Sequence, residues 1–207
     1  MMASRPALGV ILAGGRSTRL GGGDKSLLTL GGRPVLARVI ERLRPQVRAL
    51  VLNANGDPAR FAAFDVPVVS DPVGGFAGPL AGILAGLIWA SGQADPPDGI
   101  VTAAADTPFF PADLAARLTA AAGKDGLAIA RTNGRLHPVF GYFPMGCADD
   151  LDAFLSGQAS RKVTDWLDRM GFTAVDFPRG ECPADPFFNI NTPADLAAAE
   201  ASILQAG

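Results

Sequence analysis

The chain is poor in the residue types on which enzymes depend for covalent catalysis. It has one histidine, His137, and two cysteines, Cys147 and Cys182, which lie far apart and outside any metal-ligand spacing. No serine or cysteine stands in a triad-like context, so the sequence offers no activated nucleophile. We interpret both cysteines as reduced packing or surface thiols of a cytoplasmic protein.

The chain is also short of positive charge and of long apolar runs. Its 18 Lys and Arg are balanced by 20 Asp and Glu, for a formal net charge of −2, and no long basic run occurs. This balance excludes a general nucleic-acid-binding surface. The apolar stretch Pro79–Ala90 has about 12 residues and contains glycines, whereas a helix needs ~20 residues to cross a bilayer. We therefore expect no membrane partner.

An apolar run near the start, Ala7–Ala13 after Arg5, has a faint likeness to a signal peptide. The run is at the short limit for such a segment and leads directly into a glycine-rich loop. We interpret it as the first buried strand of a cytoplasmic protein. With 207 residues, of which 48% are hydrophobic, the chain suits a single packed domain spanning 1–207.

Apolar runs and helical periodicity alternate along the chain. In the first half, strands are expected at 8–13, 49–52, 66–69 and 100–105, and helices are expected to start at Pro34, Pro79 and Pro111. This alternation predicts an α/β fold with a mostly parallel sheet covered by helices on both faces. In the second half, strands are expected at 127–131, 138–143 and 174–177, and helices at 147–155 and 161–170. A last helix is expected after the capping residue Thr192, with Pro193 and Asp195 in its first turn.

The most informative segment is the loop that follows the first strand, within LGVILAGGRSTRLGGGDK at 8–25. Its glycines, Gly14 and Gly15 among them, allow positive φ and a close approach of the backbone to an anion. Successive N–H groups in such a turn form an anion-binding nest. Arg19 and Lys25 add positive charge, so a polyphosphate is the expected ligand. The spacing is neither the P-loop pattern nor the dinucleotide pattern G-x-G-x-x-G.

Each strand of the first half ends at a position suited to a polar ligand. The first ends at Gly14 and Gly15, the second at Asn53, the third at Asp71 and the fourth at Asp106. Ligands of open α/β sheets bind outside the carboxyl ends of the strands, so these positions are expected to converge on one nucleotide site. Asp106 offers the hard carboxylate oxygen that suits Mg²⁺, which binds one or two carboxylates together with substrate phosphates.

Each of these residues also has a plainer explanation. Lys25 and Arg19 are then ordinary solvated cations, Asp106 caps a helix, and Asn53 and Asp71 are only turn residues. The sequence leaves these alternatives open.

With no activated nucleophile, the sequence favours a reaction in which an already ionised phosphate attacks the α-phosphate of a nucleotide and pyrophosphate leaves.

Short motifs spread along nearly the whole chain resemble those of the molybdenum cofactor guanylyltransferases, within the nucleotidyltransferase superfamily. They are LAGG at Leu12–Gly15, GGGDKSLL at Gly21–Leu28, NAN at Asn53–Asn55, GPLAG at Gly78–Gly82, DTP at Asp106–Pro108 and NINTPADL at Asn189–Leu196. The first and last motifs are specific in combination, whereas GPLAG and DTP are weak alone. Leu20 stands where the family commonly has methionine, and both residues fill an apolar socket.

The resemblance implies a Rossmann-like nucleotidyltransferase fold. It also implies transfer of GMP from GTP to molybdenum-bound molybdopterin, with release of pyrophosphate. The family's GTP-binding positions correspond to Leu12, Ala13, Gly14, Gly15, Lys25, Asn53, Asp71 and Asp106. By the same resemblance, Asp106 would hold Mg²⁺ as the cofactor. We expect Asp106, Lys25 and Arg19 to be the catalytic residues.

The acceptor site is expected in the second half of the chain, about residues 111–207, and the nucleotide in about 1–110. A substrate phosphate needs cations and a pterin needs amide-type partners. Candidates with such side chains are Arg135, His137, Arg161, Lys162, Asn189 and Asn191. Plainer roles stay open for several of these residues, as a strand-edge residue (His137), a charged helix start (Arg161 and Lys162) or part of a helix cap (Asn191).

Two rival functions remain. The nearer is a cytidylyltransferase of the same cofactor. Gly14 favours guanine, because relatives that look specific for CTP usually carry alanine at the matching position. The other is a non-catalytic nucleotide or cofactor carrier that makes transient contact with molybdoenzymes or cofactor-insertion proteins. Lys25 and Asp106 argue against it, because a carrier has no need of a metal at the α-phosphate.

Overall fold

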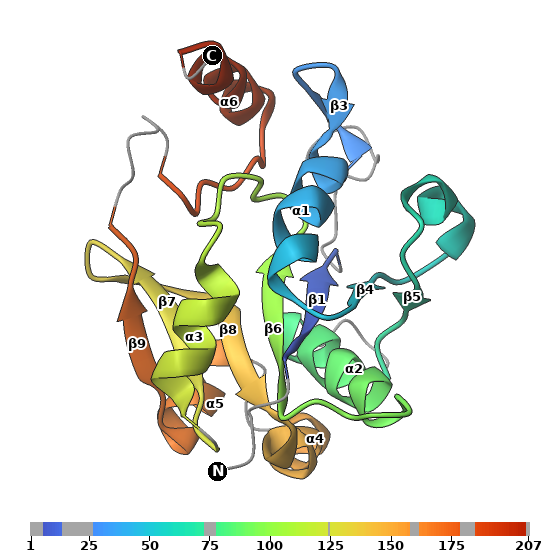
Figure 1. The fold of residues 1–207 in the computed structure, drawn as a ribbon, viewed down its shortest axis with the longest axis vertical. Coiled ribbons are helices and arrows are strands. Elements are labelled where there is room, and N and C mark those ends of the chain that lie inside the picture. Colours follow the sequence, from blue (N-terminus) through green and yellow to red (C-terminus); the bar gives the residue numbers. More distant parts are fainter. Residues whose placement is uncertain are drawn as a thin grey trace.

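Figure 1 shows the fold in a computed structural model that describes residues 6–13, 27–72, 78–123, 125–157, 162–178 and 185–205. The described strands form one large sheet in the order β5-β4-β1-β6-β8-β7-β9. Their bounds are β1 Leu8–Leu12, β4 Leu50–Asn53, β5 Val68–Val69, β6 Gly99–Ala104, β7 Ala128–Thr132, β8 Arg135–Pro144 and β9 Thr173–Asp176. Only β8 runs antiparallel to its neighbours in this sheet. The predicted, mostly parallel α/β sheet is confirmed.

Helices cover both faces of the sheet. Their bounds are α1 Val35–Leu43, α2 Pro79–Ser91, α3 Leu114–Ala122, α4 Ala148–Ser156, α5 Val163–Met170 and α6 Pro193–Gln205, with 3₁₀ helices η2 Arg44–Gln46, η3 Pro58–Phe64 and η4 Met145–Cys147. One apolar cluster lies beneath α1 and α3, and a second lies beneath α2, α4 and α5. Within the described chain, no helix has both the length and the apolar character that a bilayer crossing requires.

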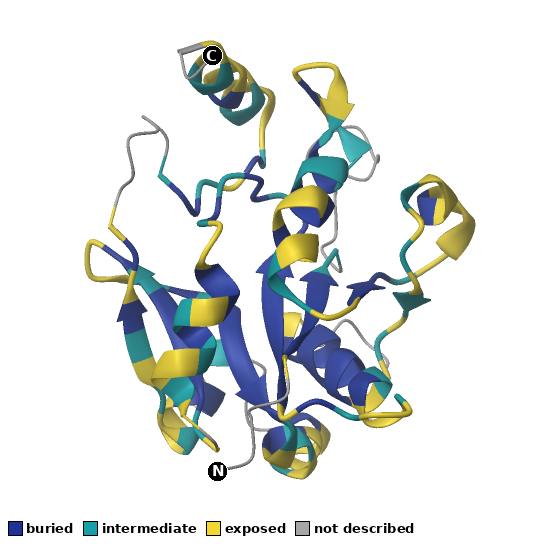
Figure 2. Cartoon of the chain, viewed as in Figure 1, coloured by how far each residue is buried: buried dark blue, intermediate teal, exposed yellow. Residues whose placement is uncertain are grey.

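The central strands are buried from both sides, as the dark colouring of β1 and β6 in Figure 2 shows. In β1, Val10 packs into the cluster beneath α2, and Ile11 packs into the cluster beneath α1. Both side chains are fully buried. Burial of one such side chain contributes about 1.5–3 kcal/mol. A strand covered on both faces needs an apolar residue at every position, which explains the continuous apolar run in the sequence.

A small hairpin and the last helix lie beyond the carboxyl edge of the sheet (Figure 1). The hairpin pairs β2, Thr29–Leu30, with β3, Arg33–Pro34. Its turn uses Gly31 and Gly32 at φ values of +54° and +76°, which glycine adopts without steric cost. Helix α6 packs on this hairpin through an apolar cluster, which is built around Leu30, Val35, Ile190 and Ala199. The predicted cap of α6 is confirmed, since Thr192 Oγ1 accepts the Asp195 N–H and Asp195 Oδ2 accepts the Thr192 N–H.

The sequence-based boundaries hold for most elements, but not for all of them. Strand β8 was expected at 138–143 and starts at Arg135, and the 3₁₀ helix η3 was not predicted. The hairpin was not predicted, because two-residue strands show no periodicity. Helix α3 was predicted to start at Pro111 but starts at Leu114. Residues 111–113 form a turn instead, in which the Leu114 N–H donates to the Pro111 carbonyl. Gln46 Oε1 then accepts the Ala115 N–H, a group that would otherwise be unpaired at the helix start.

Candidate nucleotide and acceptor site

The carboxyl ends of β4, β1 and β6 form one row at the upper edge of the sheet in Figure 1. Leu12 pairs in register with Asn53 on one side and with Ala104 on the other. The Ala13 N–H donates to the Asn53 carbonyl at 2.9 Å, and the Ala105 N–H donates to the Leu12 carbonyl at 3.1 Å. The chain therefore leaves β1 between Asn53 and the segment that carries Asp106. The loop candidates Gly14, Gly15, Arg19 and Lys25 lie outside the described residues.

Asn53 and Asp71 are joined by a hydrogen bond at this edge. Asn53 Nδ2 donates to Asp71 Oδ1 at 2.9 Å and also lies 3.3 Å from the Val69 carbonyl. On the other side, Asn55 Nδ2 donates to Asp71 Oδ2 at 2.7 Å, and Asn55 Oδ1 accepts the Asp71 N–H at 2.9 Å. Both carboxylate oxygens of Asp71 are thus held by amide groups. Asn53 is buried, so this cluster is a rigid part of the sheet edge.

Asp106 and Thr107 contact the segment that precedes α6. The Ile190 N–H donates to the Asp106 carbonyl at 2.9 Å. Thr107, which is fully buried, places its Oγ1 2.6 Å from Asn189 Oδ1 and 3.2 Å from Asp106 Oδ1. The structure therefore brings together Asp106 and Asn189, which were predicted separately as a nucleotide-site and an acceptor-site residue.

The segment with Asn189 is anchored on both sides. Phe187 is buried in an aromatic cluster, where it packs edge-on against Phe140 and Phe177. Ile190 is buried in the separate cluster beneath α6. Asn189 itself is exposed. Burial of its neighbours fixes the backbone on each side of Asn189 and holds its side chain at the surface beside Asp106.

His137, the single histidine, is nine-tenths buried on β8. Its ring stacks on Phe187 with the centroids 4.4 Å apart, and its Nε2 has no hydrogen-bond partner within the described chain. Burial lowers the pKa of His137, with the Asp185 carboxylate acting in the opposite direction. The imidazole is therefore a neutral packing group near pH 7, and one face of its ring is covered.

The remaining acceptor candidates occupy different surroundings. Arg135 opens β8 and Lys162 precedes α5, and both residues are exposed. Asn191 is partly buried, and its backbone N–H donates to Asp195 Oδ2 at 2.9 Å, so it belongs to the cap of α6. Arg161 lies outside the described residues. The acceptor role of these four residues stays a prediction.

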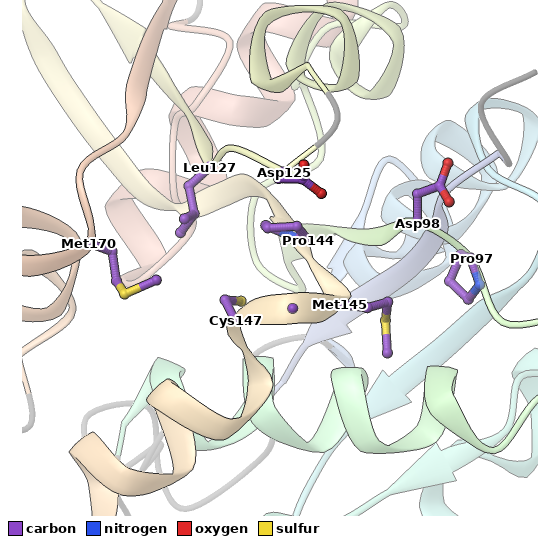
Figure 3. A pocket seen from close by; sticks show the side chains of 9 residues that line it. Pro97, Asp98, Asp125, Leu127, Pro144, Met145, Cys147 and Met170 are labelled. Atoms are coloured by element: carbon purple, nitrogen blue, oxygen red, sulfur yellow. The ribbon is translucent and has the colours of Figure 1, made fainter. Parts of the chain in front are cut away.

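A hollow of about 380 Å³ lies at the opposite edge of the sheet, between the start of β6 and the end of β8 (Figure 3). Asp98 and Asp125 are its charged residues, and Met145, Cys147 and Met170 are among its apolar ones. Burial raises the pKa of the Cys147 thiol to about 12, so the thiol stays protonated. This agrees with the packing role expected for Cys147. The negative charge of this hollow is unsuited to a polyphosphate.

Sequence reasoning did not assign a role to two residues of the site, Asn55 and Thr107. Asn55 stands in the NAN motif and Thr107 in the DTP motif, so both lay within recognised strings. Their contacts, however, join positions 16 and 82 residues apart. The sequence alone shows no pattern from which such pairs follow.

Comparison with known proteins identifies what this chain is similar to. Residues 9–170 match the family described as the MobA-like NTP transferase domain. A Mesorhizobium japonicum protein named molybdenum cofactor guanylyltransferase is 50% identical over 204 residues, which is 97% of each chain. A Bradyrhizobium protein of the same name is 52% identical over 194 residues, 93% of this chain and 91% of its own. The crystal structure of molybdopterin-guanine dinucleotide biosynthesis protein A from Archaeoglobus fulgidus is similar with a TM-score of 0.72 and 25% identity, over 96% of this chain and 99% of that one.

Proposed function

The chain belongs to the molybdenum cofactor guanylyltransferases of the MobA-like NTP transferase family, and we propose that it transfers GMP from GTP to molybdenum-bound molybdopterin. The products are the guanine dinucleotide form of the cofactor and pyrophosphate. The observation that carries the proposal is the contact between the Asp106–Thr107 pair and Asn189 at the carboxyl end of β6. Asn53 and Asp71 lie at the same edge of the sheet.

The reaction is a substitution at phosphorus. A phosphate oxygen of the acceptor attacks the α-phosphorus of GTP, a new P–O bond forms, and the bond from the α-phosphorus to the bridging oxygen of the β-phosphate breaks. The acceptor phosphate is already ionised near pH 7, so no general base is needed. The protein contributes positioning and neutralisation of charge. This requirement agrees with the carboxylate, amide and backbone groups that the described part of the site contains.

Asp106 is the residue that would hold Mg²⁺. The described residues contain no group of three or more His, Cys, Asp or Glu side chains suited to a metal. A donor set of one carboxylate completed by substrate phosphate oxygens is common for Mg²⁺, so the site fits the ion. When bound, the ion neutralises charge that develops on the phosphoryl oxygens. The Ile190 N–H holds the backbone of Asp106, which limits the directions in which its carboxylate can point.

The other assignments follow the two halves of the chain. In the half at about 1–110, Leu12, Ala13, Gly14, Gly15, Asn53 and Asp71 bind GTP, and Lys25 and Arg19 neutralise its phosphates. In the half at about 111–207, Asn189 and Asn191 offer amides to the acceptor substrate, and Arg135, Arg161 and Lys162 offer cations to its phosphate. His137 supports this half from the core, through Phe187.

Incubation with each nucleoside triphosphate, molybdenum-bound molybdopterin and Mg²⁺ tests the proposal. Mass measurement of the product is the readout. We expect the guanine dinucleotide and one pyrophosphate for each product formed. A cytosine dinucleotide as the main product would make the protein a cytidylyltransferase. Tight nucleotide binding without release of pyrophosphate would make it a carrier.

A further inference from the structure

Thr107 is a buried hydroxyl between two acceptors. Its Oγ1 lies 2.6 Å from Asn189 Oδ1 and 3.2 Å from Asp106 Oδ1. An ionised carboxylate only accepts hydrogen bonds, and a hydroxyl has one proton to donate. The shorter distance assigns that proton to Asn189. The Thr107 side chain is fully buried, so water does not reach its hydroxyl.

This bond decides which way the amide of Asn189 faces. The oxygen acceptor and the nitrogen donor of an amide lie in one plane and point in different directions from the same carbon atom. When Oδ1 is held by Thr107, Nδ2 must face away from Thr107. The described residues give Nδ2 no partner, and Asn189 is exposed. The two N–H groups of this side chain are therefore directed to the surface beside Asp106.

We propose that Thr107 is a positioning residue, which turns the donor side of the Asn189 amide toward the phosphate of the acceptor substrate. The inference rests on the proposed function and adds a residue to it. Thr107 itself is buried and touches neither substrate. Its effect passes through Asn189, since N–H groups that point at a phosphate bind it and a carbonyl oxygen in their place repels it.

Thr107→Val tests the inference, because valine keeps the shape of threonine and lacks the hydroxyl. We expect the KM for molybdenum-bound molybdopterin to rise about tenfold, as for the loss of one well-placed hydrogen bond. The affinity for GTP, measured by calorimetry without acceptor, should stay unchanged. Thr107→Ser keeps the hydroxyl and should restore the KM. The affinity for molybdenum-bound molybdopterin, measured by calorimetry, should fall by a similar factor.

Thr102→Val is the matched control. Thr102 is also a fully buried threonine, on β6, and its Oγ1 donates to the Val139 carbonyl at 2.8 Å. Thr102→Val should lower the stability of the protein about as much as Thr107→Val does, without a change in the KM for the acceptor. A purely structural role of Thr107 would make the two variants behave alike, and that result would overturn the inference.

A double-mutant cycle gives the second test. In the Asn189→Ala background, Thr107→Val should cause no further loss, because the amide that it orients is absent. Additive losses would overturn the inference while leaving the proposed function in place. If the unmodified protein releases no pyrophosphate from GTP with this acceptor, the proposed function itself fails and the inference falls with it.

Discussion

Gly82 lies against the side chain of Asn53 with no room for a Cβ between them. A Cβ on Gly82 would stand 2.3 Å from Asn53 Oδ1 and 2.8 Å from Leu12 Cδ2. Asn53 cannot easily move aside, because its Nδ2 donates to Asp71 and its side chain is buried. The glycine therefore allows α2 to approach the sheet closely enough to fix the Asn53–Asp71 pair.

Gly82→Ala should weaken nucleotide binding as well as stability. Overpacking of a core contact costs about 1–3 kcal/mol. To relieve the contact, Asn53 must give up its bond to Asp71, so we expect a higher KM for GTP together with a lower Tm. Gly86→Ala is the matched control, because its Cβ would stand 2.5 Å from Val10 Cγ2, one turn along the same helix and away from Asn53. A GTP KM that rises equally in both variants would contradict a specific role of Gly82.

Much of this fold could be predicted because its central strands and most of its helices carry strong local signals. The strand that became β6 was expected at 100–105 and spans Gly99–Ala104, and the cap of α6 at Thr192 was read from three residues. The contacts of the site were not predictable in the same way. The bond between Thr107 and Asn189 depends on how Phe187 and Ile190 pack, and that packing is a property of the whole chain.

Asn55→Ala should loosen Asp71 and raise the KM for GTP. The substitution removes the donor to Asp71 Oδ2 and the acceptor of the Asp71 N–H. Asn55→Asp should raise the KM for GTP further, because it places a second carboxylate where an amide donor stood 2.7 Å from Asp71 Oδ2. Steady-state kinetics with varied GTP is the measurement. Asp57→Ala, which removes only the cap of η3, is the control and should leave this KM unchanged. The reverse order of the two Asn55 variants would argue against a donor role.

Asp106→Asn should remove most turnover while the fold stays intact. It keeps the shape of the side chain and removes the charge that would hold Mg²⁺, so kcat should fall by about a hundredfold or more. A second readout is Mn²⁺ binding in the presence of GTP, followed by electron paramagnetic resonance, which should weaken. Asp113→Asn is the control, since Asp113 is exposed at the start of α3. Near-normal turnover and unchanged Mn²⁺ binding would remove Asp106 from the metal site.

Gly14→Ala should lower the use of GTP more than the use of CTP. Gly14 lies outside the described residues, so this prediction comes from the sequence. Without a Cβ, the backbone can approach the larger base and bind the edge of guanine with its own N–H and C=O groups. A mismatched base leaves such groups unpaired, which is a strong basis for discrimination. The ratio of kcat/KM for GTP and CTP is the measurement. An unchanged ratio would show that another residue selects the base.

His137 should make stability depend on pH between about 7 and 5.5, near the ordinary histidine pKa of about 6.5. Its pKa in the folded protein is lowered by burial against Phe187. Below pH 6.5 the unfolded chain therefore takes up a proton that the folded chain does not, and the unfolded state is favoured. The contribution of His137 to stability is fully present above the pKa that it has in the unfolded chain. It is lost as the pH falls toward the lower pKa that it has in the folded chain.

The chain has no other histidine, so an effect near the ordinary histidine pKa can be assigned to this residue. For the unmodified protein, the Tm measured across this range should decrease as the pH is lowered. His137→Phe keeps an aromatic ring on Phe187 and removes the unpartnered Nε2, so its Tm should change little over the same range. His137→Phe should also be the more stable protein at the acid end, because it has no buried imidazole that must remain unprotonated. Parallel Tm curves for the two proteins would mean that the imidazole is protonated equally in the folded and unfolded states.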